Sequence, residues 1–313
     1  MLAYDRVKKG GSESGQLAWK KRVGRGTLAN AATPTPCASD THVWAFFGTG
    51  LLVCLDRDGE QVWERDLVKD YGKYDITFGM GSSPRLWNDL LYVACMTKGP
   101  SYVVALNKET GSEVWKKARK LPAEHDGPDA YSTPVVLTGK NRSELLISGA
   151  DHINSYDLLS GKQHWVSDGL KIASEYGRVI ASPAVSDDVI VATSANPAGA
   201  GKGRAIALRT GGSGSVSKSH RAWSLEKSSP DSSTPVCYEG NAYLITDEGV
   251  ATCIDLSSGE AHWQKRLGKG PYHTAAVAGD GKVYFVNIEG QCVVVEAGSE
   301  GKILSKNQLA GTF

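Results

Sequence analysis

Short apolar segments alternate with turn residues along the whole chain. In one stretch, residues 242–245, 250–255 and 261–267 are strand-like and rich in apolar and β-branched side chains, and Asp, Ser and Gly at 247–249 and 257–259 separate them. Strands of this length divided by glycine-containing turns are typical of antiparallel sheets. No apolar period of 3.6 residues persists over three turns, so the pattern predicts an all-β protein.

A segment of eleven residues recurs along the chain and ends each time in tryptophan. "ALNKETGSEVW" occupies residues 105–115, and "CIDLSSGEAHW" occupies residues 253–263. Copies of this segment, some shortened or extended, end at Trp19, Trp63, Trp115, Trp165, Trp223 and Trp263. A Ser-Pro or Thr-Pro dipeptide lies upstream in most repeats, and successive prolines from Pro36 to Pro235 are 48 to 52 residues apart. Repeats of about 40 to 50 residues with four strands each are typical of propeller blades.

The residues of the repeated segment are those that a tight turn between the third and fourth strands of a blade requires. An Asp or Asn ends the third strand, and its side chain can accept hydrogen bonds from the backbone of the turn. The glycine that follows supplies the positive φ of a tight hairpin. The tryptophan then lies on the outer strand, where the next blade covers its indole. We therefore predict that the repeated tryptophans are structural docking residues. The turn acids or amide are Asp5, Asp56, Asn107, Asp157 and Asp255, and the glycines are Gly15, Gly59, Gly111, Gly161 and Gly259.

This repeat, most complete from Ala105 to Trp115, resembles the tryptophan-docking motif of pyrroloquinoline-quinone-type (PQQ-like repeat) β-propellers. That family includes quinoprotein alcohol dehydrogenases and the propeller lipoprotein of the outer-membrane β-barrel assembly machinery. The chain looks most similar to exported propellers of planctomycete-like bacteria that are related to this lipoprotein. The resemblance covers nearly the whole chain and implies a β-propeller of four-stranded antiparallel blades, but the family's fold carries several functions.

We expect residues 1–313 to form a single β-propeller domain. Residues 1–30 supply the last two strands of a half-blade, and six full blades start near residues 31, 80, 130, 179, 231 and 271. A propeller avoids exposed sheet edges by closing its ring, so the half-blade predicts a domain that is incomplete at one or both ends. The resemblance implies an intact form with seven or eight blades and a signal peptide that is missing from this sequence. A closed ring of this kind is expected to be monomeric.

The charge balance limits the classes of partner. The chain has 35 Lys and Arg against 34 Asp and Glu, which gives a formal net charge of +1. This charge is too small to attract the phosphates of a nucleic acid. No apolar run approaches the roughly 18 residues of a transmembrane helix. We therefore expect neither nucleic acid as a partner nor a transmembrane segment.

The six cysteines are not arranged as a metal or disulfide motif. Cys54 and Cys253 occupy a position that holds Ala or Ser in the sister repeats, and this substitution predicts buried packing thiols. No Cys-x-x-Cys pair is present, so we expect no structural metal. Two adjacent cysteines, which the resemblance implies for a quinoprotein alcohol dehydrogenase, are also missing from the sequence.

Loops carried by a rigid propeller are the expected place for a binding site. The connections between blades are long and contain polar and aromatic side chains, which we expect to gather around the mouth of the central channel. The candidate binding face consists of Tyr74, Asp75, Tyr131, His152, Tyr176, Arg178, Asp231 and His273. Asp151, Asp247 and Glu289, from the loops between second and third strands, are possible additions. The alternative interpretation is that these polar groups only satisfy each other and water.

These observations favour a non-catalytic propeller that binds a protein or glycan partner through this loop face as a scaffold of the cell envelope. No spacing identifies a catalytic, cofactor-binding or metal-binding residue, so we expect no cofactor. The family resemblance, not the chain itself, suggests the periplasm or cell envelope as the compartment. The main alternative is a quinoprotein dehydrogenase, or its degenerate descendant, with PQQ and calcium as cofactors. A polysaccharide lyase or glycoside hydrolase is a further alternative.

Overall fold

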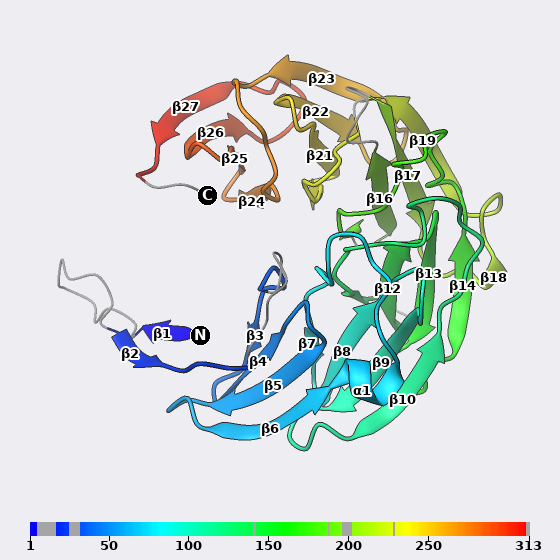
Figure 1. The fold of residues 1–313 in the computed structure, drawn as a ribbon. Coiled ribbons are helices and arrows are strands. Elements are labelled where there is room, and N and C mark those ends of the chain that lie inside the picture. The colour runs from blue at the N-terminus through cyan, green and yellow to red at the C-terminus, as the bar shows by residue number, and fades with distance from the viewer. Residues whose placement is uncertain are drawn as a thin grey trace. The chain divides into compact units, whose positions relative to one another are not determined.

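The computed structural model describes residues 1–4, 17–24, 32–139, 142–186, 188–195, 202–227 and 229–310. They belong to two compact units, Met1–Ala118 and Arg119–Phe313. Apart from one helix of five residues, all regular elements in these ranges are strands (Figure 1), which confirms the all-β prediction. Within the same ranges, no helix has the length and apolar character needed to cross a membrane.

The first unit contains one two-stranded sheet and two four-stranded antiparallel sheets. Its strands are β1 (Leu2–Tyr4) and β2 (Leu17–Lys20); β3 (Cys37–Ala38), β4 (His42–Phe46), β5 (Leu51–Asp56) and β6 (Gln61–Asp66); and β7 (Arg85–Trp87), β8 (Leu90–Cys95), β9 (Tyr102–Asn107) and β10 (Glu113–Ala118). The helix α1 (Leu67–Tyr71), which the sequence pattern did not predict, follows β6 directly. It forms there because the side chain of Asp66 caps it, accepting hydrogen bonds from the amides of Val68 and Lys69.

The second unit contains four sheets that follow one another in chain order, each with four antiparallel strands and with the last long strand on the outer side (Figure 1). Its strands are β11 (Val135–Thr138), β12 (Ser143–Gly149), β13 (His152–Asp157) and β14 (Gln163–Ser167); β15 (Ala184–Val185), β16 (Val189–Ala195), β17 (Lys202–Arg209) and β19 (Arg221–Lys227); β20 (Val236–Tyr238), β21 (Asn241–Ile245), β22 (Val250–Asp255) and β23 (Ala261–Arg266); and β24 (Val277–Gly279), β25 (Lys282–Val286), β26 (Gln291–Glu296) and β27 (Ile303–Gln308). The described residues thus form six full blades and one two-stranded half-blade, as predicted.

In the four described blades whose third strand ends at Asp56, Asn107, Asp157 or Asp255, this side chain fixes the turn that follows. Asp255 Oδ1 accepts hydrogen bonds from the amides of Ser257 and Ser258, at 3.0 and 2.8 Å. Asn107 Oδ1 accepts two equivalent bonds from the amides of Glu109 and Thr110, both at 3.0 Å. Asp5 and Gly15, predicted to act in the same way, lie outside the described residues.

Each repeated tryptophan stands opposite a small residue on the neighbouring strand. Trp263 pairs with Cys253 and Trp63 pairs with Cys54, in both cases just before a bulge. The other pairs are Trp19 with Ala3, Trp115 with Ala105, Trp165 with Ser155 and Trp223 with Ala207. A large side chain opposite the indole would crowd the sheet face, so the small residue of the repeat makes room for the ring.

The two cysteines at this position are fully buried, and all six cysteines of the chain are free thiols. Burial raises the pKa of Cys54 to about 12 and that of Cys253 to about 11. A protonated thiol is neither a good nucleophile nor a metal ligand. Both side chains therefore act as packing groups.

The indole of one blade lies against the turn of the next. Trp263 Nε1 donates a hydrogen bond to the carbonyl of Gly298 at 3.0 Å, and a Cβ on Gly301 would lie 2.5 Å from the ring. Trp19, Trp63 and Trp223 donate to the carbonyls of Arg57, Lys108 and Leu256, at 2.7, 2.9 and 3.0 Å, and lie against Gly59, Gly111 and Gly259. The turn glycine therefore provides space for the preceding blade's indole as well as a positive φ.

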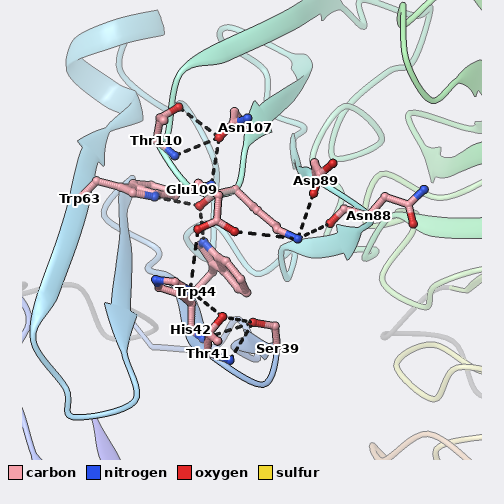
Figure 2. Close-up of polar contacts among 11 residues, drawn as sticks. Ser39, Thr41, His42, Trp44, Trp63, Asn88, Asp89, Asn107, Glu109 and Thr110 are labelled. Atoms are coloured by element: carbon pink, nitrogen blue, oxygen red, sulfur yellow. Dashed lines mark hydrogen bonds and ion pairs between the residues drawn. The ribbon is translucent and has the colours of Figure 1, made fainter.

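A second tryptophan reinforces this contact in the first unit (Figure 2). Trp44 Nε1, from the buried strand β4, donates to the same Lys108 carbonyl as Trp63 Nε1, also at 2.9 Å. The Lys108 side chain is held by the Asn88 carbonyl at 3.0 Å and the Asp89 carboxylate at 3.1 Å. Trp44 is fully buried, and its hydrogen bond joins two neighbouring sheets.

Trp165 is bound differently from the other indoles. Its Nε1 donates at 2.8 Å to the buried carboxylate of Glu144, which belongs to the same sheet and also accepts from Ser155 and Arg142. The outer edge of this sheet is covered by the insertion of the following repeat, where β18 (Gly214–Ser215) pairs in parallel with β14. The carboxylate and the insertion take the place of the turn that covers the four indoles described above.

The Ser-Pro and Thr-Pro dipeptides connect neighbouring blades through their hydroxyl groups. In the second unit, the Thr133 amide donates to Ser182 Oγ at 2.9 Å, and the Ser182 amide donates to Thr234 Oγ1 at 3.1 Å. In the first unit, the Thr35 amide donates to Ser83 Oγ at 2.9 Å. The repeat requires a hydroxyl at this position because it satisfies a backbone amide of the preceding blade.

Candidate functional site

Two connections between blades of the second unit lie side by side. Ala130 and Val179 form a parallel bridge, and the Tyr131 amide donates to the Val179 carbonyl at 3.0 Å. The neighbouring Arg178 is 9% exposed, and its guanidinium lies 3.8 Å from the Asp126 carboxylate. One guanidinium nitrogen also donates to the Tyr176 carbonyl at 3.2 Å. The paired backbones hold this cation in a nearly buried position.

Three charged side chains from the next two blades complete a cluster with Arg178. Asp231 lies in the connection that precedes β20, Asp247 lies in the turn between β21 and β22, and His273 lies in the connection that precedes β24. His273 Nε2 is 3.3 Å from Asp247 Oδ2, and the Asp231 amide donates to Asp247 Oδ1 at 3.3 Å. We refer to Arg178, Asp231, Asp247 and His273 as the charged cluster.

Asp231 has the most perturbed carboxylate of the charged cluster. Its side chain is nearly buried, and its Oδ1 accepts no hydrogen bond from any residue that the structure describes. Burial, and after it the charge of Asp247, raises the pKa of Asp231 to about 6, although the charges of Arg178 and His273 act in the opposite direction. Asp231 therefore ionises at a higher pH than an ordinary aspartate does.

A pocket of about 330 Å³ is lined by residues of both connections. Glu124, Asp151, Lys171 and Glu175 supply its charged groups, and the Lys171 ammonium lies 2.9 Å from the Glu124 carboxylate. Asp151 is nearly buried, and burial raises its pKa. The pocket is thus polar and mostly acidic, as suits contacts with polar groups of another molecule rather than an apolar ligand.

The candidate residues from the sequence occupy three different settings. Arg178, Asp231 and His273 belong to the charged cluster. Tyr131 and Tyr176 flank it, and the Tyr176 side chain is 49% exposed. His152 is the first residue of β13 and follows Asp151, which lines the pocket, and its Nδ1 is 2.5 Å from the Ala150 carbonyl.

Tyr74 and Asp75 belong to the first unit. The Tyr74 hydroxyl lies 3.4 Å from Cys95 Sγ and 3.3 Å from the Tyr102 hydroxyl, against the apolar core of that unit. Asp75 is exposed, and its carbonyl accepts a hydrogen bond from the Lys98 amide at 3.0 Å. These two residues have no part in the site described here, which consists of residues of the second unit.

Three contributing residues were not singled out from the sequence, namely Asp126, Glu124 and Lys171. All three lie in connections recognised as long and polar. Their individual roles depend on the pairing of residues 126–131 with residues 175–179, and no repeat position signals this pairing.

The arrangement holds charged groups in fixed positions, as a binding surface does. No group of three or more His, Cys, Asp and Glu side chains in the described ranges is placed to hold a metal ion. The indoles of Trp19, Trp63, Trp223 and Trp263 are bound to turn carbonyls, which leaves them unable to stack on a quinone. The residues described therefore do not fit PQQ with calcium.

Four-stranded sheets joined by tryptophan-docked turns define a β-propeller of the PQQ-like repeat class. The chain belongs to the family of the outer membrane protein assembly factor BamB, whose sequence model matches residues 48–304. It is 21% identical over 301 residues to the outer membrane protein assembly factor BamB of Yersinia pestis, in an alignment that covers 93% of this chain and 70% of that protein. The family resemblance inferred from the repeats is confirmed.

Solved structures show the same fold at low sequence identity. BamB from Moraxella catarrhalis superposes with a TM-score of 0.70 and 16% identity, over 95% of this chain and 81% of that chain. The quinohemoprotein alcohol dehydrogenase ADHIIG from Pseudomonas putida HK5 superposes with a TM-score of 0.57 and 14% identity, over 86% of this chain and 52% of that chain. These likenesses establish the propeller fold and leave the function to the site.

Proposed function

We propose that this chain is a non-catalytic scaffold of the bacterial cell envelope that binds a protein partner through the loop face of its second unit. The observation that carries the proposal is the charged cluster, in which a nearly buried Arg178 and Asp231 face Asp247 and His273. Charged groups held in fixed positions by rigid loops give an interface its specificity and register.

Membership of the BamB family supports the compartment and the kind of partner. The family's description, outer membrane protein assembly factor, names a factor in the assembly of outer membrane proteins, so proteins of the envelope are the expected partners. A scaffold of this kind needs neither a cofactor nor a catalytic residue. The pocket beside the charged cluster extends the polar surface available to a partner.

The proposal is tested by retention of partners from an envelope extract. The immobilised chain is compared with the double variant Arg178→Ala/His273→Ala and with a control double variant, Lys162→Ala/Glu260→Ala, altered only at exposed turn residues. We expect the first variant to lose specific proteins that the wild type and the control retain. Thermal unfolding of all three chains, and the single variant His273→Ala at a half-exposed site, separate lost binding from lost folding. An identical set of retained proteins in all variants would exclude this face as the binding surface.

A further inference from the structure

The pocket lined by the two connections contains a nearly buried acid without a bonding partner. Asp151 lines this pocket and is 8% exposed. No described residue donates a hydrogen bond to its carboxylate or forms an ion pair with it, yet neither carboxylate oxygen is sealed from solvent, unlike Asp231 Oδ1. Burying an unpaired carboxylate costs free energy, and burial accordingly raises the pKa of Asp151. An acid kept in this state and open to a pocket indicates a site for a ligand.

The backbone turn that carries Asp151 does not explain why an acid stands there. Ala150 and Asp151 form the two-residue turn between β12 and β13, because Gly149 pairs with His152. Both turn residues have positive φ, 48° and 62°, for which Asn-Gly is the favoured pair. The Leu170 amide donates to the Asp151 carbonyl at 3.1 Å, which holds the turn against the connection that follows β14. The turn thus places the carboxylate at the pocket without needing its charge.

Carboxylates outnumber cations in the wall of the pocket. Its ionisable residues are Glu124, His125, Asp151, Lys171 and Glu175. The Lys171 ammonium is bound to Glu124 at 2.9 Å, and these two side chains are 61% and 70% exposed. The charges of Lys171 and His152 act on Asp151 only from beyond ion-pair distance. The wall therefore keeps an excess of negative charge around an inner carboxylate that has no ion-pair partner among the described residues.

We propose that this pocket binds a cation carried on an alkyl chain, a primary ammonium or a guanidinium, which donates to the carboxylate of Asp151. The bond would be charge-assisted and nearly buried. Ile172 and Ala173 line the same pocket, where they can contact the methylene groups of the chain. The volume of about 330 Å³ is close to the lower limit of small-molecule sites, so it suits one such chain. An organic cation is favoured over a metal ion because the described residues offer no set of three metal ligands.

Two sources could carry this cation, a free polyamine or a lysine or arginine side chain of a protein. The chemistry at Asp151 is the same for both. The site shares no residue with the charged cluster, so it goes beyond the proposed scaffold function and is tested separately from it.

The test titrates the full chain with small probes. Putrescine represents a polyamine and N-acetyl-lysinamide represents a side chain, while 1,4-butanediol and N-acetyl-norleucinamide are their uncharged counterparts. Proton–nitrogen NMR follows the backbone amides of Leu170 and of residues 150–152. We expect saturable shifts of these amides with at least one cationic probe and none with the uncharged analogues. The cationic probe that binds more tightly identifies the source, a polyamine for putrescine and a protein side chain for N-acetyl-lysinamide.

Variants of the chain complete the test. Asp151→Asn keeps the shape of the side chain and tolerates the positive φ, so it should fold and should bind the cation at least about tenfold more weakly. Asp255→Asn, which changes an acid in an exposed turn to the residue found at the equivalent Asn107, should bind as the wild type does. Full affinity in Asp151→Asn, or equal shifts with the uncharged analogues, would overturn the inference. The absence of saturable shifts with both cations would also overturn it, and would mean that Lys171 already satisfies Asp151 in solution. None of these outcomes alters the partner retention expected for Arg178→Ala/His273→Ala.

Discussion

The backbone amide of Thr133 donates a hydrogen bond to the hydroxyl of Ser182, 49 residues later in the chain, at 2.9 Å. This bond joins the starts of two neighbouring blades and gives the Ser-Pro and Thr-Pro dipeptides a physical role. The Ser182 amide donates to the Thr234 hydroxyl in the same way, so the same hydrogen bond recurs from one blade to the next. A repeat protein gains its stability from such nearest-neighbour terms.

Replacing Ser182 with Ala should destabilise the protein by about 1 kcal/mol, because the Thr133 amide loses its acceptor. Ser182→Thr keeps the hydroxyl that Thr133 and Thr234 carry at the same repeat position, and it serves as the matched control. Urea unfolding followed by tryptophan fluorescence measures both variants. Equal midpoints for the two variants would mean that the hydroxyl contributes nothing across the blades.

Gly301→Ala should be more harmful than Gly281→Ala, although both glycines have positive φ, 61° and 66°. A Cβ at Gly281 meets no atom within 4 Å, so this change adds only backbone strain of about 1 kcal/mol. A Cβ at Gly301 would lie 2.5 Å from the Trp263 indole, and the overlap should add about 1 to 3 kcal/mol. Thermal unfolding of the pair isolates the docking contact. Similar losses in the two variants would indicate that the indole moves aside freely.

The blades could be predicted from the sequence because their signals are local. The Asp255 turn, its glycine and Trp263 lie within eleven residues, so a single short segment is enough to show the motif. The contacts between blades could not be predicted in the same way. The partner of Trp44 is a carbonyl 64 residues away, and Trp165 depends on a buried Glu144 that occurs in one repeat only.

The candidate site was predictable as a region but not as a set of contacts. Long polar connections indicated Arg178, Asp231 and His273, and the structure brings these together with Asp247 because three successive blades place their connections side by side. Tyr74 came from the same type of connection, yet its hydroxyl lies among Cys95 and Tyr102 in the core of its own unit. Sequence does not reveal which side of a loop turns inward, since that depends on packing between distant strands.

Asp231→Asn should stabilise the protein at pH 7.5 and have little effect at pH 4.5. The pKa of Asp231 is raised to about 6, so the folded chain binds more protons than the unfolded chain between about pH 4 and pH 6. Stability contributed by the protonated carboxyl is therefore lost as pH rises through this range. The gain for the amide at pH 7.5 should reach about 3 kcal/mol at most. Thermal melts of wild type and variant from pH 4.5 to 8 measure this dependence.

The pKa of Asp255, in the same unit, is shifted in the opposite direction. The Ser257 hydroxyl, with the Ser258 amide and hydroxyl, lowers the pKa of Asp255 to about 2. Its contribution to stability is present above the unfolded value near 4 and is lost as pH falls toward 2. Asp255→Ala should therefore destabilise the chain at pH 7.5, where Asp231→Asn stabilises it. If both variants change stability in the same direction at pH 7.5, the pKa values of Asp231 and Asp255 are not shifted in opposite directions, and the prediction is wrong.

Addition of PQQ and calcium should change neither the visible absorption nor the thermal unfolding of the protein. The indoles that could stack on a quinone are used elsewhere, since Trp223 and Trp263 donate to turn carbonyls and lie against turn glycines. The chain also has no two adjacent cysteines. A quinoprotein dehydrogenase purified without its cofactor provides the positive control for both measurements. A new absorption band together with a rise in unfolding temperature would show that the chain binds the quinone, and would make the dehydrogenase the better hypothesis.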